Sequence, residues 1–420
     1  MKIPELVAPA GNLEKCEIAL HFGADAVYFG LKELNLRAGA HNFSPNEARE
    51  AISLVRRKGK KAYLTLNAFL FNHDLSTVEK MLSVTQDIKP DAMIISDPAL
   101  IEMAREKCPE IRLHLSTQMN VTNWRAVKFW HDQGIQRIVL ARELDLNSIR
   151  EIKNRVPECE IEVFVHGAMC LAYSGRCLLS ALLTGRNANK GDCTQPCRWK
   201  YRIKEISSGK EDIVIEEDVS GTSLLSSKDL CLFDYIPELV DAGINTFKIE
   251  GRAKSAYYTG IVTRSYRKVL DACAQGSKTS PIPTNQSLYT SISSFPEFDK
   301  VSIWRNELYK VSHREYTTGF TFPSDEPLQT YCDESYIRET RFLGIVLARE
   351  GATNHVAVRD RMSVGQEIEI VGPETNRKAV VKQILKEDGT TIEEAHPNQE
   401  VVLHLSHPAE PFSLLRCRIE

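Results

Sequence analysis

Short apolar runs alternate with helix-like stretches through most of the chain, and this alternation limits the fold more than any other feature. Eight runs have the Val, Ile and Leu content that parallel strands buried on both faces require. They are Glu5–Ala8, Ala26–Gly30, Lys61–Asn67, Ala92–Ser96, Arg112–Ser116, Arg137–Ala141, Glu160–His166 and Asn245–Glu250. Helical stretches follow them. The one after Ser44 has a cap residue, an early proline and an acidic first turn.

Eight strand–helix units over residues 1–276 predict an α/β fold, a TIM-like (β/α)8 barrel of roughly 250 residues. An open, doubly wound sheet is the alternative. A Cys-rich insertion at 168–225 separates the seventh and eighth strands. Beyond a connecting segment at 277–337, short alternating runs and turn residues predict a small all-β barrel at 338–420.

Composition excludes several classes of protein. The 420 residues include 53 Lys and Arg against 56 Asp and Glu, which excludes a protein that is basic overall. A local basic patch that binds nucleic acid stays possible. No apolar run approaches the ~18 residues of a membrane span, and the start lacks a signal-peptide pattern. We therefore expect a cytoplasmic protein without a membrane partner, whose clustered cysteines serve a metal or catalysis in place of disulfides.

Polar residues follow nearly every predicted strand, at the end where a barrel carries its active site. Lys248 and Glu250 share one face of the last strand and form either a structural ion pair or part of a substrate site. Arg252 adds a planar fork suited to carboxylate or phosphate. The predicted catalytic residues are His166, Lys248 and Glu250, and the predicted substrate-binding residues are Asn67, His114, Gln118, Arg142 and Arg252. A lone histidine is often only hydrogen-bonded structure, which is the alternative for His114 and His166.

The insertion concentrates thiols. Cys170, Cys177, Cys193 and Cys197 lie within 28 residues in the pattern C-x6-C-x15-C-x3-C. Four thiolates suit either a structural zinc ion or an iron–sulfur cluster. Structural zinc favours shorter spacings, which only the last pair approaches, so the chemistry leans modestly towards a 4Fe-4S cluster. Cys231, in a stretch expected to be helical, is the alternative fourth ligand.

The same insertion is locally basic and aromatic. Basic side chains bind phosphates and aromatic rings stack on unpaired bases, so this pattern predicts an RNA contact. The predicted RNA-binding residues are Arg186, Lys190, Arg198, Trp199 and Lys200. A solvated rim is the alternative.

The run from Glu162 to Ser180 resembles the collagenase-like peptidase family of unassigned catalytic type, family U32. The matching residues are Glu162-x-Phe164-x-x-Gly167-Ala168-Met169-Cys170, followed by Ser174-Gly175-x-Cys177-x-x-Ser180. Residues 4–11, 23–28 and 248–252 look like the family's first two units and its last strand. The predicted C-terminal barrel is similar to the family's own C-terminal domain.

Several bacterial members of that family are hydroxylases of a tRNA wobble uridine, of a ribosomal-RNA cytidine, or in ubiquinone synthesis. The resemblance implies a 4Fe-4S cluster on the four cysteines and, for RNA-directed members, prephenate as co-substrate. Residues 191–201 and 313–320 are most similar to the tRNA-directed members. The resemblance thus implies prephenate-dependent hydroxylation of a tRNA wobble uridine, with tRNA and a small carboxylate as partners. A shorter segment between Tyr201 and Ser226 departs from those members.

Other functions stay open at this point. Another RNA or a small aromatic compound can be the substrate of the same chemistry. Proteolysis fits the family's name, although the chain has no H-E-x-x-H helix and no G-x-S-x-G elbow. A non-catalytic RNA-binding protein fits the basic insertion but leaves the polar strand exits unexplained.

Overall fold

The N-terminal part of the chain is a closed parallel barrel, as the sequence predicts. The computed structural model describes residues 2–37, 41–199, 226–276, 298–323, 328 and 336–419. The barrel strands are β1 (Glu5–Pro9), β2 (Ala26–Gly30), β3 (Lys61–Leu66), β4 (Ala92–Ile95), β5 (Arg112–Leu115), β6 (Arg137–Val139), β7 (Glu160–Ala168) and β9 (Thr246–Ile249). Their order is β7-β6-β5-β4-β3-β2-β1-β9, and pairing of β9 with β7 closes the ring. This closure excludes the open sheet.

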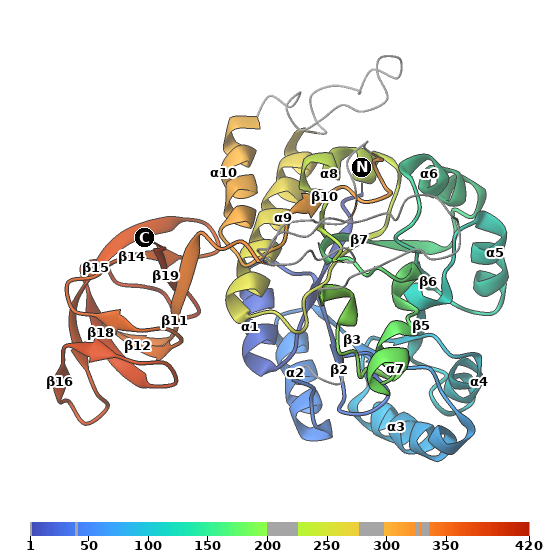
Figure 1. Ribbon diagram of the computed structural model, residues 1–420, viewed down its shortest axis with the longest axis horizontal. Helices are drawn as coiled ribbons and strands as arrows, with labels where there is room; N and C mark the ends of the chain where they lie inside the picture. Colours follow the sequence, from blue (N-terminus) through green and yellow to red (C-terminus); the bar gives the residue numbers. More distant parts are fainter. Residues whose placement is uncertain are drawn as a thin grey trace, which may run out of the picture.

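Helices surround the barrel (Figure 1). They are α1 (Leu13–His21), α2 (Pro45–Arg57), α3 (Leu75–Ile88), α4 (Pro98–Lys107), α5 (Trp124–Asp132), α6 (Leu146–Arg155), α8 (Ile236–Asp241) and α9 (Ala256–Gly276). Ser44 caps α2 as the sequence predicts, and it does so through a capping box with Glu47. Because the strands are covered by helices outside and by side chains inside, nearly every strand residue is buried.

Two short strands extend the sheet beyond the barrel. β7 runs past the barrel end, where β8 (Asp229–Cys231) pairs with it in the antiparallel direction. In turn, β10 (Tyr316–Thr317) pairs with β8. The helix predicted around Cys231 is therefore wrong, because the unpaired edge of β7 offers backbone partners that draw this segment into the sheet.

The C-terminal part is a second, antiparallel barrel. Its strands are β11 (Thr340–Glu350), β12 (Thr353–Val358), β14 (Glu367–Val371), β15 (Asn376–Leu385), β18 (Glu400–Leu405) and β19 (Leu414–Arg418), with short strands β13 (Met362–Ser363), β16 (Thr391–Ile392) and β17 (Glu394–Ala395). The order β14-β19-β11-β12-β18-β15 closes through pairing of β14 with β15. The all-β barrel is thus confirmed, with a core of its own.

The described part of the predicted connecting segment contains β10 and α10 (Phe298–Tyr309), which packs against α9. In Figure 1 the C-terminal barrel lies on the side of the N-terminal barrel that α1, α9 and α10 cover. The boundaries at 276 and 338 stay predictions. None of the helices in the described residues has the length and apolar character to cross a membrane.

A buried ionic cluster joins the two barrels. Glu307 on α10 accepts hydrogen bonds from Arg264 on α9 at 2.7 Å and from Arg416 on β19 at 2.7 and 2.8 Å. All three side chains are at most 2% exposed. Arg416 also pairs with Glu369 at 2.7 Å and donates to the Tyr257 hydroxyl at 2.9 Å. The network fixes the C-terminal barrel on the helices of the N-terminal one.

We expect Glu307→Gln to destabilise the protein by about 3–5 kcal/mol, because it removes the carboxylate shared by two buried arginines. Chemical denaturation followed by circular dichroism measures the change. Asp132→Asn is the matched control, since its pair with Lys128 is half exposed on both sides and its loss should matter little. Equal stability of Glu307→Gln and wild type would contradict the role of the cluster.

The same contacts predict a pH dependence. Burial alone raises the pKa of the Glu307 carboxyl, but Arg416 and Arg264 outweigh burial and bring the pKa to about 2, from 4.5 in the absence of these contacts. A lowered folded-state pKa means that the stabilisation is complete above pH 4.5 and is lost as the pH falls towards 2. Wild type should therefore lose stability on acidification through this window more steeply than Glu307→Gln.

Candidate active site at the barrel mouth

A cavity of about 650 Å³ lies at the carboxyl ends of the barrel strands. Side chains from β2, β3, β4, β6, β7 and β9 line it, together with residues just past β5 and the described part of the Cys-rich insertion. Predicted site residues in its wall are Asn67, Gln118, Arg142, Cys170, Cys177, Cys193, Cys197, Arg198, Lys248, Glu250 and Arg252. The barrel thus brings together residues that are far apart in the sequence.

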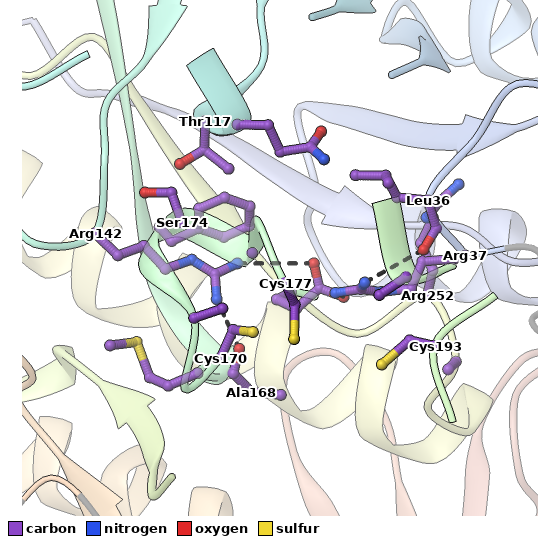
Figure 2. Close-up of a pocket in the computed structure, with 18 of the residues that line it drawn as sticks. Leu36, Arg37, Thr117, Arg142, Ala168, Cys170, Ser174, Cys177, Cys193 and Arg252 are labelled. Carbon is purple, nitrogen blue, oxygen red and sulfur yellow. Dashed lines mark hydrogen bonds and ion pairs between the residues drawn. The ribbon is translucent and has the colours of Figure 1, made fainter. Parts of the chain in front are cut away.

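Glu250 is the carboxylate around which the cations of the mouth gather. Arg37 approaches its Oε1 at 3.4 Å and Arg142 its Oε2 at 4.0 Å. Burial alone raises the pKa of Glu250, but Arg37, Arg142, Arg252 and Lys248 outweigh it and hold the pKa below its usual value. Figure 2 shows Arg142 and Arg37 reaching the cavity from opposite sides. One carboxylate therefore faces several cations.

Arg252 is buried without an acidic partner. Its guanidinium donates to Thr65 Oγ1 at 3.1 Å and to Asn35 Oδ1 at 3.4 Å, which are both neutral groups. Among the described residues, no carboxylate lies within ion-pairing distance of it. Burial lowers the pKa of Arg252 to about 10, so it keeps its charge at neutral pH. A buried, charged fork of this kind is a ready site for an anionic ligand.

The floor of the cavity carries a second ionic group. Lys248 Nζ donates to Glu162 Oε1 at 2.7 Å, and Arg137 Nη1 lies 3.4 Å from Glu162 Oε2. Glu162 is fully enclosed by the barrel. Lys248 also lies over the Tyr28 ring, 4.5 Å from its centroid. The carboxylate partner of Lys248 is therefore Glu162 on β7, although Lys248 and Glu250 both line the cavity.

All four cysteines of the insertion line this cavity, whereas Cys231 does not. The Cys231 thiol lies 3.9 Å from the Tyr266 hydroxyl, behind the barrel wall. In Figure 2 the sulfur atoms of Cys170 and Cys193 point towards the space between these two residues. Burial raises the pKa of Cys197, and negative charge on Cys170, Cys193 or Cys177 raises it further, so the other three thiols lie near enough to influence Cys197.

Short hydrogen bonds shape the segment that carries these cysteines. Glu143, just past β6, accepts from the Ser174 amide and hydroxyl, both at 2.6 Å. The Asn189 side chain accepts from Cys177 N at 3.1 Å and donates to Cys177 O at 3.0 Å. The short helix α7 (Leu179–Thr184) lies between the first and second cysteine pairs. The thiols are thus placed by the barrel and not only by their own loop.

The donor set fits a thiolate-bound metal group. Within the described ranges, no three His, Cys, Asp or Glu side chains are grouped closely enough to hold a single metal ion. Four thiols around one cavity match the ligands of a four-iron cluster, in which each metal takes its own thiolate. Cys170, Cys177, Cys193 and Cys197 are the residues that would hold it.

Neither predicted histidine lines the cavity. His166 lies behind the wall, 3.3 Å from the Tyr266 hydroxyl, and burial lowers its pKa to about 3. A register shift between Phe164 and His166 in the pairing with β9 breaks the alternation and directs His166 away from the mouth. His114 is fully buried beside Tyr63, one step below the strand end. We therefore assign neither residue to substrate.

The predicted RNA-binding residues differ in their contacts and exposure. Arg198 lines the cavity and donates to the Tyr336 hydroxyl at 2.9 Å, and Trp199 is exposed. Arg186 pairs with Asp192, and Lys190 pairs with Asp74 at 3.0 Å. Lys200 lies outside the described residues.

Sequence reasoning missed Arg37 and the roles of Glu162 and two glycines. Arg37 follows β2 in a loop with no motif, so no signal marked it. Glu162 is a charged residue between the apolar residues Ile161 and Val163 of a buried strand, which is a detectable signal. Gly167 has φ +110°, and a Cβ there would meet Glu250 O at 2.4 Å; a Cβ at Gly30 would meet the Arg252 guanidinium at 2.5 Å. These glycines let the backbone approach the charged mouth.

Comparison with known protein families shows which family this chain belongs to. The sequence profile of peptidase family U32 matches residues 11–330, and that of the peptidase family U32 C-terminal domain matches residues 338–416. The chain belongs to peptidase family U32.

Relatives of this U32 protein align along most of its length. The tRNA hydroxylation protein P1 of Bacillus subtilis is 38% identical, over 99% of this chain and 95% of the relative. The tRNA hydroxylation protein P of Escherichia coli is 36% identical, over 89% of this chain and 87% of the relative. A collagenase of Porphyromonas gingivalis is 30% identical, over 98% of this chain and 97% of the relative. The relatives of this U32 protein thus carry both RNA-hydroxylation and peptidase names.

Proposed function

We propose that this protein hydroxylates the wobble uridine of tRNA, with prephenate or a similar dicarboxylate as hydroxyl donor. The observation that carries the proposal is the unpaired buried Arg252 beside four thiols in one cavity. The names of the relatives at 36–38% identity support RNA hydroxylation as the reaction.

The arginines of the mouth support an anionic donor. Arg252 has only neutral partners, and Arg37 and Arg142 share one carboxylate, Glu250. A dicarboxylate supplies the missing negative charge, and each guanidinium can bind one carboxylate through two parallel hydrogen bonds. Lys248 stays bound to Glu162 and holds a fixed positive charge at the floor.

The reaction balances without a further oxidant. Replacing a C–H bond of the base by C–OH removes two electrons from the base. A donor that gives up its hydroxyl group in exchange for hydrogen accepts those two electrons. The four cysteines would hold a 4Fe-4S cluster, which supplies electron-transfer chemistry when it is bound.

A wobble uridine can reach such a cavity because the anticodon loop is single-stranded. Its base splays out without melting a duplex. Arg198 at the cavity edge and the exposed ring of Trp199 are placed to contact phosphate and base. Arg186 and Lys190 already have acidic partners and should contribute less.

Proteolysis is the second candidate, because one relative over nearly the full length is called a collagenase. A cysteine peptidase needs a thiol with a lowered pKa and a nearby base. Burial raises the pKa of Cys197, and the described residues that line the cavity include no histidine. The geometry therefore favours hydroxylation.

Replacing any one of Cys170, Cys177, Cys193 and Cys197 by Ser should remove most of the iron and the brown colour, because one iron loses its thiolate. Anaerobic purification followed by iron and zinc analysis measures this. Cys231→Ser is the matched control and should keep full iron. Loss of iron in Cys231→Ser but not in Cys197→Ser would contradict the assigned ligands, and stoichiometric zinc in place of iron would contradict the cluster.

A strain without this protein, and without a paralogue of the same activity, should lose hydroxyuridine from its tRNA. Nucleoside mass spectrometry of bulk tRNA measures the loss, and re-expression of the wild-type chain should restore the nucleoside. An unchanged hydroxyuridine level would contradict the proposal. Cleavage of gelatin by the pure protein under metal-free conditions would support proteolysis instead.

A further inference from the structure

Three side chains in the cavity wall form one hydrogen-bonded unit. Asn67 follows β3, and Ser116 and Gln118 follow β5. Asn67 Nδ2 donates to Ser116 Oγ at 3.4 Å, and Ser116 Oγ donates to Gln118 Oε1 at 3.2 Å. All three line the same cavity as Arg252 and the four cysteines.

The Ser116 hydroxyl couples the two amides. A hydroxyl has one hydrogen, so when it donates to one amide oxygen it accepts from the NH2 group of the other amide. The amide atoms that are not bonded to Ser116, called the outward atoms below, are then Asn67 Oδ1, an acceptor, and Gln118 Nε2, a donor. If both amides turn over together the two roles exchange, but the pair still offers one donor and one acceptor.

Both outward atoms lack a partner. Asn67 Oδ1 and Gln118 Nε2 are shielded from solvent and make no hydrogen bond within the described part of the chain. Gln118 as a whole is only 2% exposed. Buried amide groups are nearly always hydrogen-bonded, so one unmatched donor and one unmatched acceptor on a single unit of the cavity wall point to a ligand that supplies both partners.

The unit is held on rigid parts of the barrel. Ser96 Oγ donates to Asn67 O at 3.0 Å, and Ser116 N donates to Ile95 O at 2.8 Å. Thr117, between Ser116 and Gln118, donates through its hydroxyl to Leu140 O at 3.0 Å. The amide pair therefore keeps its position in the wall without a ligand.

We propose that Asn67, Ser116 and Gln118 read the polar edge of the target base, so that the mouth has separate base and carboxylate subsites. A uracil edge offers an N–H donor beside a carbonyl acceptor, which matches a mixed amide pair. A carboxylate offers acceptors alone, and it matches the arginines. This inference rests on the proposed function and specifies which residues recognise the base.

The coupling has a consequence for the choice between pyrimidines. Uracil presents N3–H and O4, whereas cytosine presents N3 and the N4 amino group, so donor and acceptor are exchanged. The concerted turn of the two amides produces the complementary exchange. With one amide bonded to each side of the Ser116 hydroxyl, as observed, uridine and cytidine are alternative partners of one unit, and the single hydroxyl hydrogen disfavours a state with two outward donors.

The test measures binding and does not depend on turnover. The probes are a synthetic anticodon stem-loop with uridine at the wobble position and the same RNA with an abasic residue there. Fluorescence anisotropy gives the dissociation constant of each for the purified holoprotein. Wild type should prefer the uridine RNA by about tenfold, the effect of two hydrogen bonds to buried groups.

Gln118→Glu keeps the shape but presents only acceptors when ionised, so its preference for uridine over the abasic residue should fall to about one. Gln133→Glu, the same change on the exposed end of α5, is the control and should keep the wild-type preference. Ser116→Ala, which adds no charge, is the second variant should Gln118→Glu fail to fold, and it should lose most of the preference.

The outcomes separate this inference from the proposed function. A full preference in Gln118→Glu, or in Ser116→Ala when the first variant does not fold, would overturn base reading by this unit. Hydroxylation would then stand if tRNA from the strain lacking the protein has lost hydroxyuridine. A wild type that binds both RNAs equally would overturn the inference and would also count against entry of the base into the barrel.

Discussion

The ion pairs of Glu162 inside the barrel set the character of the whole site. This carboxylate is fully enclosed and holds Lys248 at 2.7 Å, with Arg137 at 3.4 Å on its other oxygen. A buried charge without partners is strongly destabilising, so the three strands β6, β7 and β9 are tied together by the need to keep this group satisfied. The result is a barrel whose floor is charged where most barrels are filled with hydrocarbon.

Above this floor the charges no longer balance. Arg252 binds only neutral oxygens, and Arg37 and Arg142 share Glu250. Four thiols border the same cavity, and as thiolates they would offset part of the positive charge of the arginines. Glu250 is the main group that raises the pKa of Arg37, and the thiols of Cys170 and Cys193 contribute less. An anionic ligand that lies between the arginines and the thiols completes this arrangement, and it is the core of the functional proposal.

Much of the fold follows from local signals in the sequence. The predicted barrel strands match the observed ones to within about two residues, because buried parallel strands need continuous apolar runs. The grouping of Asn67, Gln118, Arg142 and Arg252 follows from barrel geometry alone, once the strands are known. Other features depend on contacts distant in sequence. β8 forms only because β7 has a free edge, His166 is turned outward by an irregularity in pairing with β9, and Arg37 acquires its role through Glu250, more than two hundred positions away.

The proposed anion site at the barrel mouth is tested most directly by calorimetric titration of prephenate into anaerobically purified protein. Wild type and Arg252→Lys are compared. A lysine ammonium keeps the charge but cannot form two parallel hydrogen bonds to one carboxylate. We predict that wild type binds one prephenate per chain. The dissociation constant of Arg252→Lys should be at least about tenfold higher, since hydrogen bonds to charged groups contribute about 1.5–3 kcal/mol. Absence of binding to wild type, or equal binding to both proteins, would contradict the account.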